Sequence, residues 1–288
     1  VKYTWEESLP IAESASLDDI KNYSKSLYDK TYTEAMVYGD FDKTDAEKTA
    51  RLFRQKTKTK GINREEAFDL KYLKFDEPEI IQYTDNLLVN NSCFFRQYVL
   101  GEDSPQIRAV SKIISKTLQQ PFYTEMRTNQ QLGYIVWSYT NNLDETHFLN
   151  FLIQSGVYPA DELNRRADEF IISSAEIINS MDSETFQQVV DSIIEELEKT
   201  PMSIAERARK LKTYIFEHDA DYLRDQDTIE SLRTIDKETV SNLLDSTVSP
   251  QSRRMVNILT FAENHENTTK VKNSFSNLDT WKASRAYK

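Results

Sequence analysis

The sequence predicts an α+β fold, because segments with strand character and segments with helical periodicity follow one another in blocks. Residues 133–140 and 147–154 have the aromatic and branched residues of strands and are joined by a polar loop, as in an antiparallel pair. After Pro159 the apolar residues have the spacing of amphipathic helices. RRMVNILTF at 253–261 resembles TEAMVYGDF at 33–41, and this repeat indicates two related domains.

The first elements expected are two helices on either side of a strand. Ser16 is a suitable N-cap for a helix with a one-sided apolar stripe. A strand is expected at 32–41, and a second helix runs from about Thr44 to the KTKTKG segment at 56–61. We place a domain boundary near residues 61–64.

Strands are expected to dominate the next part of the chain. Runs of aromatic and branched residues predict strands at 68–75, 87–88 and 93–100. Ser104 followed by Pro105 then predicts a helix start, because proline at the first helical position loses no hydrogen bond.

Three helices are expected after Pro159. The apolar spacing predicts one at 163–178 and one at 186–197, and the third begins at Ser203. Glu206 follows Ser203 at the spacing of a capping box, in which each side chain binds a free amide of the first turn. Asp236 opens a last helix before the final strand.

The composition favours a globular protein that binds neither nucleic acid nor membranes. The 288 residues are 39% hydrophobic and have a net charge of −11, so an anionic backbone or membrane surface would be repelled. No apolar run approaches the roughly 20 residues that span a bilayer. The single cysteine, Cys93, cannot form an intramolecular disulfide and is interpreted as a buried structural thiol.

No pattern in the sequence indicates a catalytic or metal site. His147, His218 and His265 are far apart, and none has the spacing to a glutamate that a zinc helix requires. The acidic clusters are interpreted as polar helix faces, and neither a nucleophile elbow nor a phosphate-binding loop is present. A hydrolase that uses carboxylates stays open, although no spacing argues for it.

The segment PFYTEMRTNQQLGYIV at 121–136 is interpreted as a short helix, a glycine and a strand. Gly133 would let the chain turn or let another backbone approach closely. Arg127 and Tyr134 bring a guanidinium and a phenol together, a pair that suits peptide carbonyls. A purely structural interpretation is also open, in which Arg127 pairs with Glu125 or another carboxylate and Tyr134 is a strand aromatic with a solvated hydroxyl.

This segment resembles the C-terminal half of the insulinase family of inverted zinc peptidases, the group of insulin-degrading enzyme and pitrilysin, which carries a near-identical R-T-x-x-Q-L-G-Y-I-V segment. The similarity covers most of residues 16–262, including FLNFLIQS at 148–155 and SIAE at 203–206. It implies an insulinase-type α/β roll, an antiparallel sheet packed with helices on one face.

The resemblance also implies a domain division. Residues 1–63 would be the C-terminal part of a third domain, 64–266 a complete fourth domain, and 267–288 a polar tail. The chain starts at Val1 without a methionine or a signal peptide, so we expect it to be a piece of a longer protein. Bacterial relatives are often periplasmic, which favours a cell-envelope location.

The function implied by the resemblance is that of a zinc endopeptidase whose two halves enclose a chamber. Zinc would be held by the missing N-terminal half, and none of its ligands is in this sequence. Arg127 and Tyr134 would bind the substrate backbone opposite the zinc. The chain would thus be the substrate-binding, non-catalytic half, inactive alone, with the N-terminal half and peptide substrates as partners. The alternative is a catalytically inactive scaffold or assembly subunit of the same fold.

Overall fold

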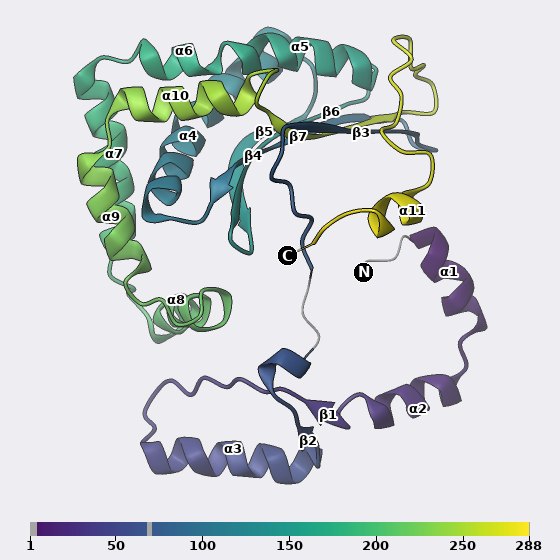
Figure 1. The fold of residues 1–288 in the computed structure, drawn as a ribbon, viewed down its shortest axis with the longest axis vertical. Helices are drawn as coiled ribbons and strands as arrows, with labels where there is room; N and C mark the ends of the chain where they lie inside the picture. The colour runs from purple at the N-terminus through teal and green to yellow at the C-terminus, as the bar shows by residue number, and fades with distance from the viewer. Residues whose placement is uncertain (1–4, 68–70, 288) are drawn as a thin grey trace. The chain divides into compact units, whose positions relative to one another are not determined.

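The computed structural model describes residues 5–67 and 71–287, and their packing divides the chain into two compact units (Figure 1). The first unit combines residues 1–71 with 201–221, and the second combines residues 72–200 with 222–288. The excursion at 201–221 therefore groups with the N-terminal part of the chain. The predicted division, which places residues 64–266 in one domain, stays a prediction.

The second unit is built on a five-stranded sheet with the strand order β3-β7-β4-β6-β5. The strands are β3 (Glu79–Asn86), β4 (Ser92–Glu102), β5 (Ile135–Leu143), β6 (Thr146–Ser155) and β7 (Arg254–Phe261). β4 runs antiparallel to β6 and β7, and β5 runs antiparallel to β6, whereas β3 is parallel to β7. The sheet is therefore antiparallel, as predicted, except for one parallel pair at its β3 edge.

Helices cover one face of this sheet, as predicted, and α4, α5 and α10 contact its strands (Figure 1). The helices of this unit are α4 (Pro105–Tyr123), α5 (Ala160–Ile172), α6 (Ser174–Asn179), α7 (Ser183–Glu198), α9 (Arg224–Thr234), α10 (Lys237–Val248) and α11 (Leu278–Ala283). Ser104 caps α4 by accepting from the Ile107 amide, with Pro105 at the first helical position. Among the described helices, none is long and apolar enough to cross a membrane.

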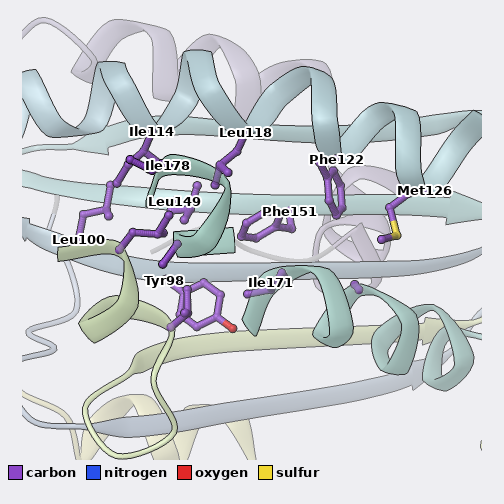
Figure 2. Packing of buried hydrophobic residues seen from close by; sticks show 14 of the residues in the cluster. Tyr98, Leu100, Ile114, Leu118, Phe122, Met126, Leu149, Phe151, Ile171 and Ile178 are labelled. Carbon is purple, nitrogen blue, oxygen red and sulfur yellow. The ribbon is translucent and has the colours of Figure 1, made fainter. Parts of the chain in front are cut away.

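The hydrophobic core lies between these helices and the sheet (Figure 2). Phe122 of α4 packs edge-on against Phe151 of β6, with ring centroids 5.0 Å apart. Each fully buried side chain of this size contributes about 1.5–3 kcal/mol to folding. The core includes Met126 and Leu132, so it fixes both ends of the segment that carries Arg127.

The first unit is small and has little buried surface of its own. It contains α1 (Trp5–Ser14), α2 (Leu17–Ser26), α3 (Lys43–Thr57), α8 (Ile204–Glu217), the 3-10 turn Arg64–Glu66 and the parallel pair β1 (Lys30–Thr31) and β2 (Lys60–Gly61). Ser16 caps α2 as predicted, in a reciprocal capping box with Asp19. Neither α2 nor α3 has a buried residue.

Several predicted strands are wrong in position. The strand expected at 32–41 is not formed, because a strand needs a paired neighbour and none of the described residues pairs with this segment. Residues 68–70 of the strand expected at 68–75 lie outside the described residues, and Leu73 makes only an isolated bridge. The strand expected at 87–88 lies earlier in the chain. The residues that pair are those of the more polar segment EIIQYTDN, which forms β3 and ends at Asn86.

Other corrections concern local hydrogen bonds. The helix expected at 163–178 breaks at Ser173, whose hydroxyl bonds to the carbonyls of Glu169 and Phe170. The capping box expected at Ser203 is only half formed: the Glu206 amide donates to Ser203, but the Glu206 carboxylate accepts from the Met202 amide instead.

Cys93 is partly rather than fully buried, so the predicted buried thiol is only partly correct. Burial nevertheless raises the pKa of the Cys93 thiol to about 11. The thiol therefore stays protonated at neutral pH and is a poor nucleophile.

Candidate functional site

The segment singled out in the sequence begins where α4 changes into a π-helical turn. α4 ends at Tyr123, and residues Thr124–Asn129 form the π-helix. Such wider turns are frequent at functional sites because they re-aim the side chains that follow. The Leu132 amide then donates to the Met126 carbonyl and closes the turn. The turn thus carries Arg127 at a position fixed by buried neighbours.

Glu125 is not the partner of Arg127. The Glu125 carboxylate accepts from the amide groups of Asn129, at 2.7 Å, and Gln130, at 2.8 Å. These two hydrogen bonds lower the pKa of Glu125 below its ordinary value. The pairing of Arg127 with Glu125 in the structural interpretation is therefore wrong, and no carboxylate among the described residues forms an ion pair with Arg127.

Arg127 lies between two aromatic rings. Its Cζ atom is 4.7 Å from the centre of the Tyr134 ring and 5.1 Å from the centre of the Tyr123 ring. Cation–π contacts of this kind contribute about 0.5–1 kcal/mol each at exposed sites and favour one orientation of the guanidinium. No described group accepts a hydrogen bond from Arg127, so its N–H donors can bind an acceptor.

Tyr134 lies immediately before β5 and is 79% exposed. No described group hydrogen-bonds to its hydroxyl, which is therefore available to a ligand. Gly133 next to it makes the close approach predicted from the sequence: a Cβ atom there would lie 1.9 Å from the carbonyl oxygen of Gln154 in β6. Gly133 thereby fixes the backbone position of Tyr134 relative to β6.

Sequence reasoning found Arg127, Tyr134 and Gly133 but not Tyr123. Tyr123 lies four residues before Arg127, the spacing at which helical side chains meet, and that spacing could have revealed it. A cavity of about 600 Å³ is lined by other residues of the same turn and does not include Arg127. Its lining residues are Gln120, Pro121, Thr124, Glu125, Met126, Asn129, Gln130, Glu169, Phe170 and Ser173.

The buried histidine of this unit belongs to a separate polar cluster. His147 Nε2 lies 2.6 Å from Asp103 Oδ1, and His147 Nδ1 lies 3.3 Å from Ser111 Oγ. The two oxygens of Asp103 also accept both Nη groups of Arg224. Serine, histidine and aspartate meet here as in a hydrolase triad, but Ser111 and His147 are 4% and 7% exposed. The cluster connects α4, α9 and the sheet and gives a substrate no access to the serine.

His265 has a different partner and does not join His147. Its Nδ1 atom lies 2.8 Å from Ser92 Oγ. Across residues 5–67 and 71–287, no three His, Cys, Asp or Glu side chains gather so that they could hold a metal ion. The zinc implied by the resemblance therefore has no ligand set among the described residues.

The fold and the Arg127–Tyr134 segment resemble those of an insulinase-type domain, and comparison with known proteins finds the same likeness. The family described as "PQQ synthase PqqF-like, C-terminal lobe domain 4" matches residues 113–212. The insulin-degrading enzyme of Drosophila melanogaster is 22% identical over 244 residues, which are 80% of this chain and 24% of that protein. This chain resembles the C-terminal part of the insulinase-type peptidases, as the sequence predicted.

Solved structures show the same fold. The crystal structure of pitrilysin matches with a TM-score of 0.82 and 18% identity, over 100% of this chain and 31% of that chain. The crystal structure of a peptidase M16 inactive domain from Pseudomonas fluorescens matches with a TM-score of 0.59 and 16% identity, over 88% and 58%. The chain spans about a quarter of the length of the curated relatives that it matches.

Proposed function

We propose that this chain is the non-catalytic, substrate-binding part of a zinc endopeptidase that degrades peptides. Arg127 is the observation that carries the proposal. It is held between Tyr123 and Tyr134 without a carboxylate partner among the described residues, and its N–H donors are available. A positioned guanidinium without an acceptor suits a peptide carbonyl, on which negative charge develops when it is attacked.

The proposed division of labour needs a second part of the protein. This chain supplies orientation and hydrogen-bond donors: Arg127 binds a carbonyl oxygen, and the Tyr134 hydroxyl donates to or accepts from a neighbouring peptide group. Zinc, bound by an N-terminal half, would supply an activated water. The partners are thus the N-terminal half of the same protein and peptide substrates, and the chain alone is inactive.

The test is hydrolysis of an unstructured peptide by the complete protein. Arg127→Ala should lower kcat/KM by at least about tenfold, because it removes both donors and stacking. Arg127→Lys should recover only part of the activity, since an ammonium lacks the planar fork. Tyr134→Phe keeps the ring under Arg127 and isolates the contribution of the hydroxyl.

Arg165→Ala is the matched control, because Arg165 is an exposed arginine that already pairs with Glu162 and Glu169. A chelator should abolish hydrolysis by every active variant. Unchanged hydrolysis by Arg127→Ala would refute the proposed role of this residue.

A second candidate function is a catalytically inactive scaffold or assembly subunit of the same fold. The similarity to the Pseudomonas fluorescens domain, which is described as inactive, favours keeping it. It predicts that the complete, metal-loaded protein hydrolyses no peptide while still forming its assembly. Chelator-sensitive hydrolysis would exclude it.

A further inference from the structure

The face of the sheet opposite α4, α5 and α10 has a row of apolar side chains across all five strands (Figure 1). Along β5 and β6, residues in the core, such as Val136 and Phe151, alternate with residues on this opposite face. The register of the strands places one opposite-face residue of each strand side by side. These five residues, which we call the apolar row, are Trp137 in β5, Leu152 in β6, Phe95 in β4, Ile258 in β7 and Tyr83 in β3.

The residues on both sides of the apolar row are almost free of charge. By the same register, one flanking row is Tyr139, Asn150, Gln97, Val256 and Ile81, and the other is Ile135, Gln154, Cys93, Thr260 and Asp85. Asp85, on β3, is the only charged residue in these three rows of described residues. A charged group placed at the β5 end would lose water without gaining an ion pair from these rows, so this end favours apolar groups.

The two ends of the apolar row differ in what covers them. At the β3 end, the Ser274 amide donates to the Gln82 carbonyl and holds the C-terminal part of the chain beside β3. The Phe275 ring stacks on the Tyr83 ring, with centroids 6.0 Å apart and 15° between the ring planes. At the β5 end, Trp137 is 55% exposed, and no described ring stacks on it. The end at Trp137 is therefore available to a ligand.

Phe275 shows what kind of group this face accepts from a segment of chain without regular secondary structure. The segment is held by a backbone hydrogen bond and places an aromatic ring on the apolar row. Aromatic pairs of this kind contribute more than the burial of their area alone. The uncovered end offers the same chemistry, because Trp137 lies beside Leu152 in the row.

Trp137 is also close to the residues proposed to bind the peptide backbone. It follows Tyr134 by three residues, which is about 10 Å along an extended chain. Tyr134 in turn contacts Arg127, whose Cζ atom is 4.7 Å from the centre of the Tyr134 ring. An extended peptide covers the same distance of about 10 Å with about three residues. One bound peptide can therefore reach both Arg127 and Trp137.

We propose that Trp137 determines specificity by holding an aromatic side chain of the substrate peptide against Leu152 and the apolar row. This side chain belongs to a residue about three positions from the carbonyl that Arg127 binds. The inference rests on the proposed peptide-binding function and adds the substrate class, which is unstructured peptides with an aromatic residue at this position. The peptide ring stacks on Trp137 as Phe275 stacks on Tyr83.

The test uses three fluorescent peptides of about nine Gly and Ser residues, blocked at both ends, whose central residue is Phe, Ala or Gln. About four residues on each side let the peptide reach Arg127 in either direction. Gln tests a polar side chain without a charge that Arg127 could attract. Binding to the 288-residue chain is measured by anisotropy. The Phe peptide should bind at least about tenfold more tightly than the other two. Equal binding of the three peptides would overturn the proposed specificity.

Protein variants test whether Trp137 is the cause of this preference. Trp137→Ala should bind the Phe peptide no more tightly than the Ala peptide, whereas Trp137→Phe should keep most of the preference. The matched control is Tyr222→Ala, because Tyr222 precedes α9 and is also 55% exposed. It should keep the full preference.

The ratio between the peptides separates specificity from a structural role of Trp137. A structural role would weaken binding of all three peptides equally in Trp137→Ala, and that result would overturn the proposal. An unchanged preference for Phe in this variant would overturn it as well. Circular dichroism confirms the fold, and Trp137→Thr, with a good strand-forming residue, replaces Trp137→Ala if the alanine variant does not fold.

The outcomes also separate this inference from the proposed function. Binding that depends on Arg127 but is equally tight for all three peptides would refute the aromatic specificity and leave the proposed function standing. Failure of all three peptides to bind would refute both.

Discussion

At the scale of single residues, the described chain holds its charged groups in two ways. Arg127 contacts the rings of Tyr123 and Tyr134 and has no hydrogen-bond acceptor among the described residues, so its donors are available to a ligand. Arg96 is buried and bonded to Asp168, Asn164, Tyr98 and Asn257, so its donors are used within the fold. The difference in partners, and not the residue type, is the reason why we propose a binding role for Arg127.

Gly133 should tolerate no side chain. In Gly133→Ala the new methyl group would meet the Gln154 carbonyl at 1.9 Å, and because both atoms belong to backbone, β5 must move away from β6. We expect a loss of at least about 2 kcal/mol in the free energy of unfolding, measured in urea. Gly156→Ala is the control, since its methyl group would lie 3.3 Å from the nearest atom, Asn90 O. Equal stability of the two variants would contradict the close approach.

Asp103 should make stability depend on acid pH. Burial alone would raise its pKa, but hydrogen bonds from Arg224 and His147 bring it down to about 2. The folded pKa is below the unfolded value of 3.8, so the stabilisation is complete above pH 3.8 and is lost as pH falls toward 2. Asp103→Asn should lower the free energy of unfolding by about 2–3 kcal/mol at pH 7. It should also make the free energy of unfolding depend less on pH between 3.8 and 2.

His147 should also make the free energy of unfolding depend on pH in the acid range. Burial lowers its pKa below 6.5, against the opposing hydrogen bond to Asp103. The unfolded chain then binds the proton more readily, so stability is lost as pH falls below 6.5. Denaturation in urea at a series of pH values measures both effects. The exposed Asp144→Asn is the charge-matched control, and an Asp103→Asn profile parallel to the wild type would contradict this account.

At the scale of elements, helices and strands that depend on neighbouring residues could be predicted from the sequence. Elements that depend on a partner far away in the chain could not. Ser104 and Pro105 predicted the start of α4, and the aromatic and branched residues on either side of a polar loop predicted the β5–β6 pair. The strand predicted at 32–41 failed, since pairing depends on a partner elsewhere in the chain. The π-helical turn at Thr124–Asn129 has no sequence signal that we used. Arg127 and Tyr134 could be predicted by resemblance, but their stacking with Tyr123 required the three-dimensional arrangement.

Ser274 and Asn273 accept hydrogen bonds from the Gln82 and Thr84 amides and so cover the β3 edge of the sheet, which should prevent self-association. In the double variant Asn273→Ala, Ser274→Ala, the amides of Gln82 and Thr84 lose their acceptors and the edge opens. We expect increased light scattering on mild heating, together with a loss of about 1 kcal/mol for each hydrogen bond removed. Lys272→Ala, a neighbouring exposed change, serves as the control. Scattering equal to that of the control would show that the cover does not protect this edge.

At the scale of the whole molecule, the two units differ in how much of their apolar surface they bury. The second unit encloses the core of Figure 2. The first unit leaves Ile11, Leu17, Ile20 and Tyr23 each at least 60% exposed. Its extended segment at 31–37 and α3 line a cavity of about 900 Å³. Exposed apolar surface of this extent is typical of interaction sites, and the proposed partnership with an N-terminal half requires such a surface.

The central claim is that this chain binds substrate peptides through Arg127, and equilibrium binding tests it most directly. A labelled unstructured peptide is titrated with the wild-type chain, with Arg127→Ala and with the Arg165→Ala control, without any catalytic partner. The account predicts that the wild type and the control bind alike and that Arg127→Ala binds at least about tenfold more weakly, a loss of about 1.4 kcal/mol. Equal binding by all three chains would contradict it.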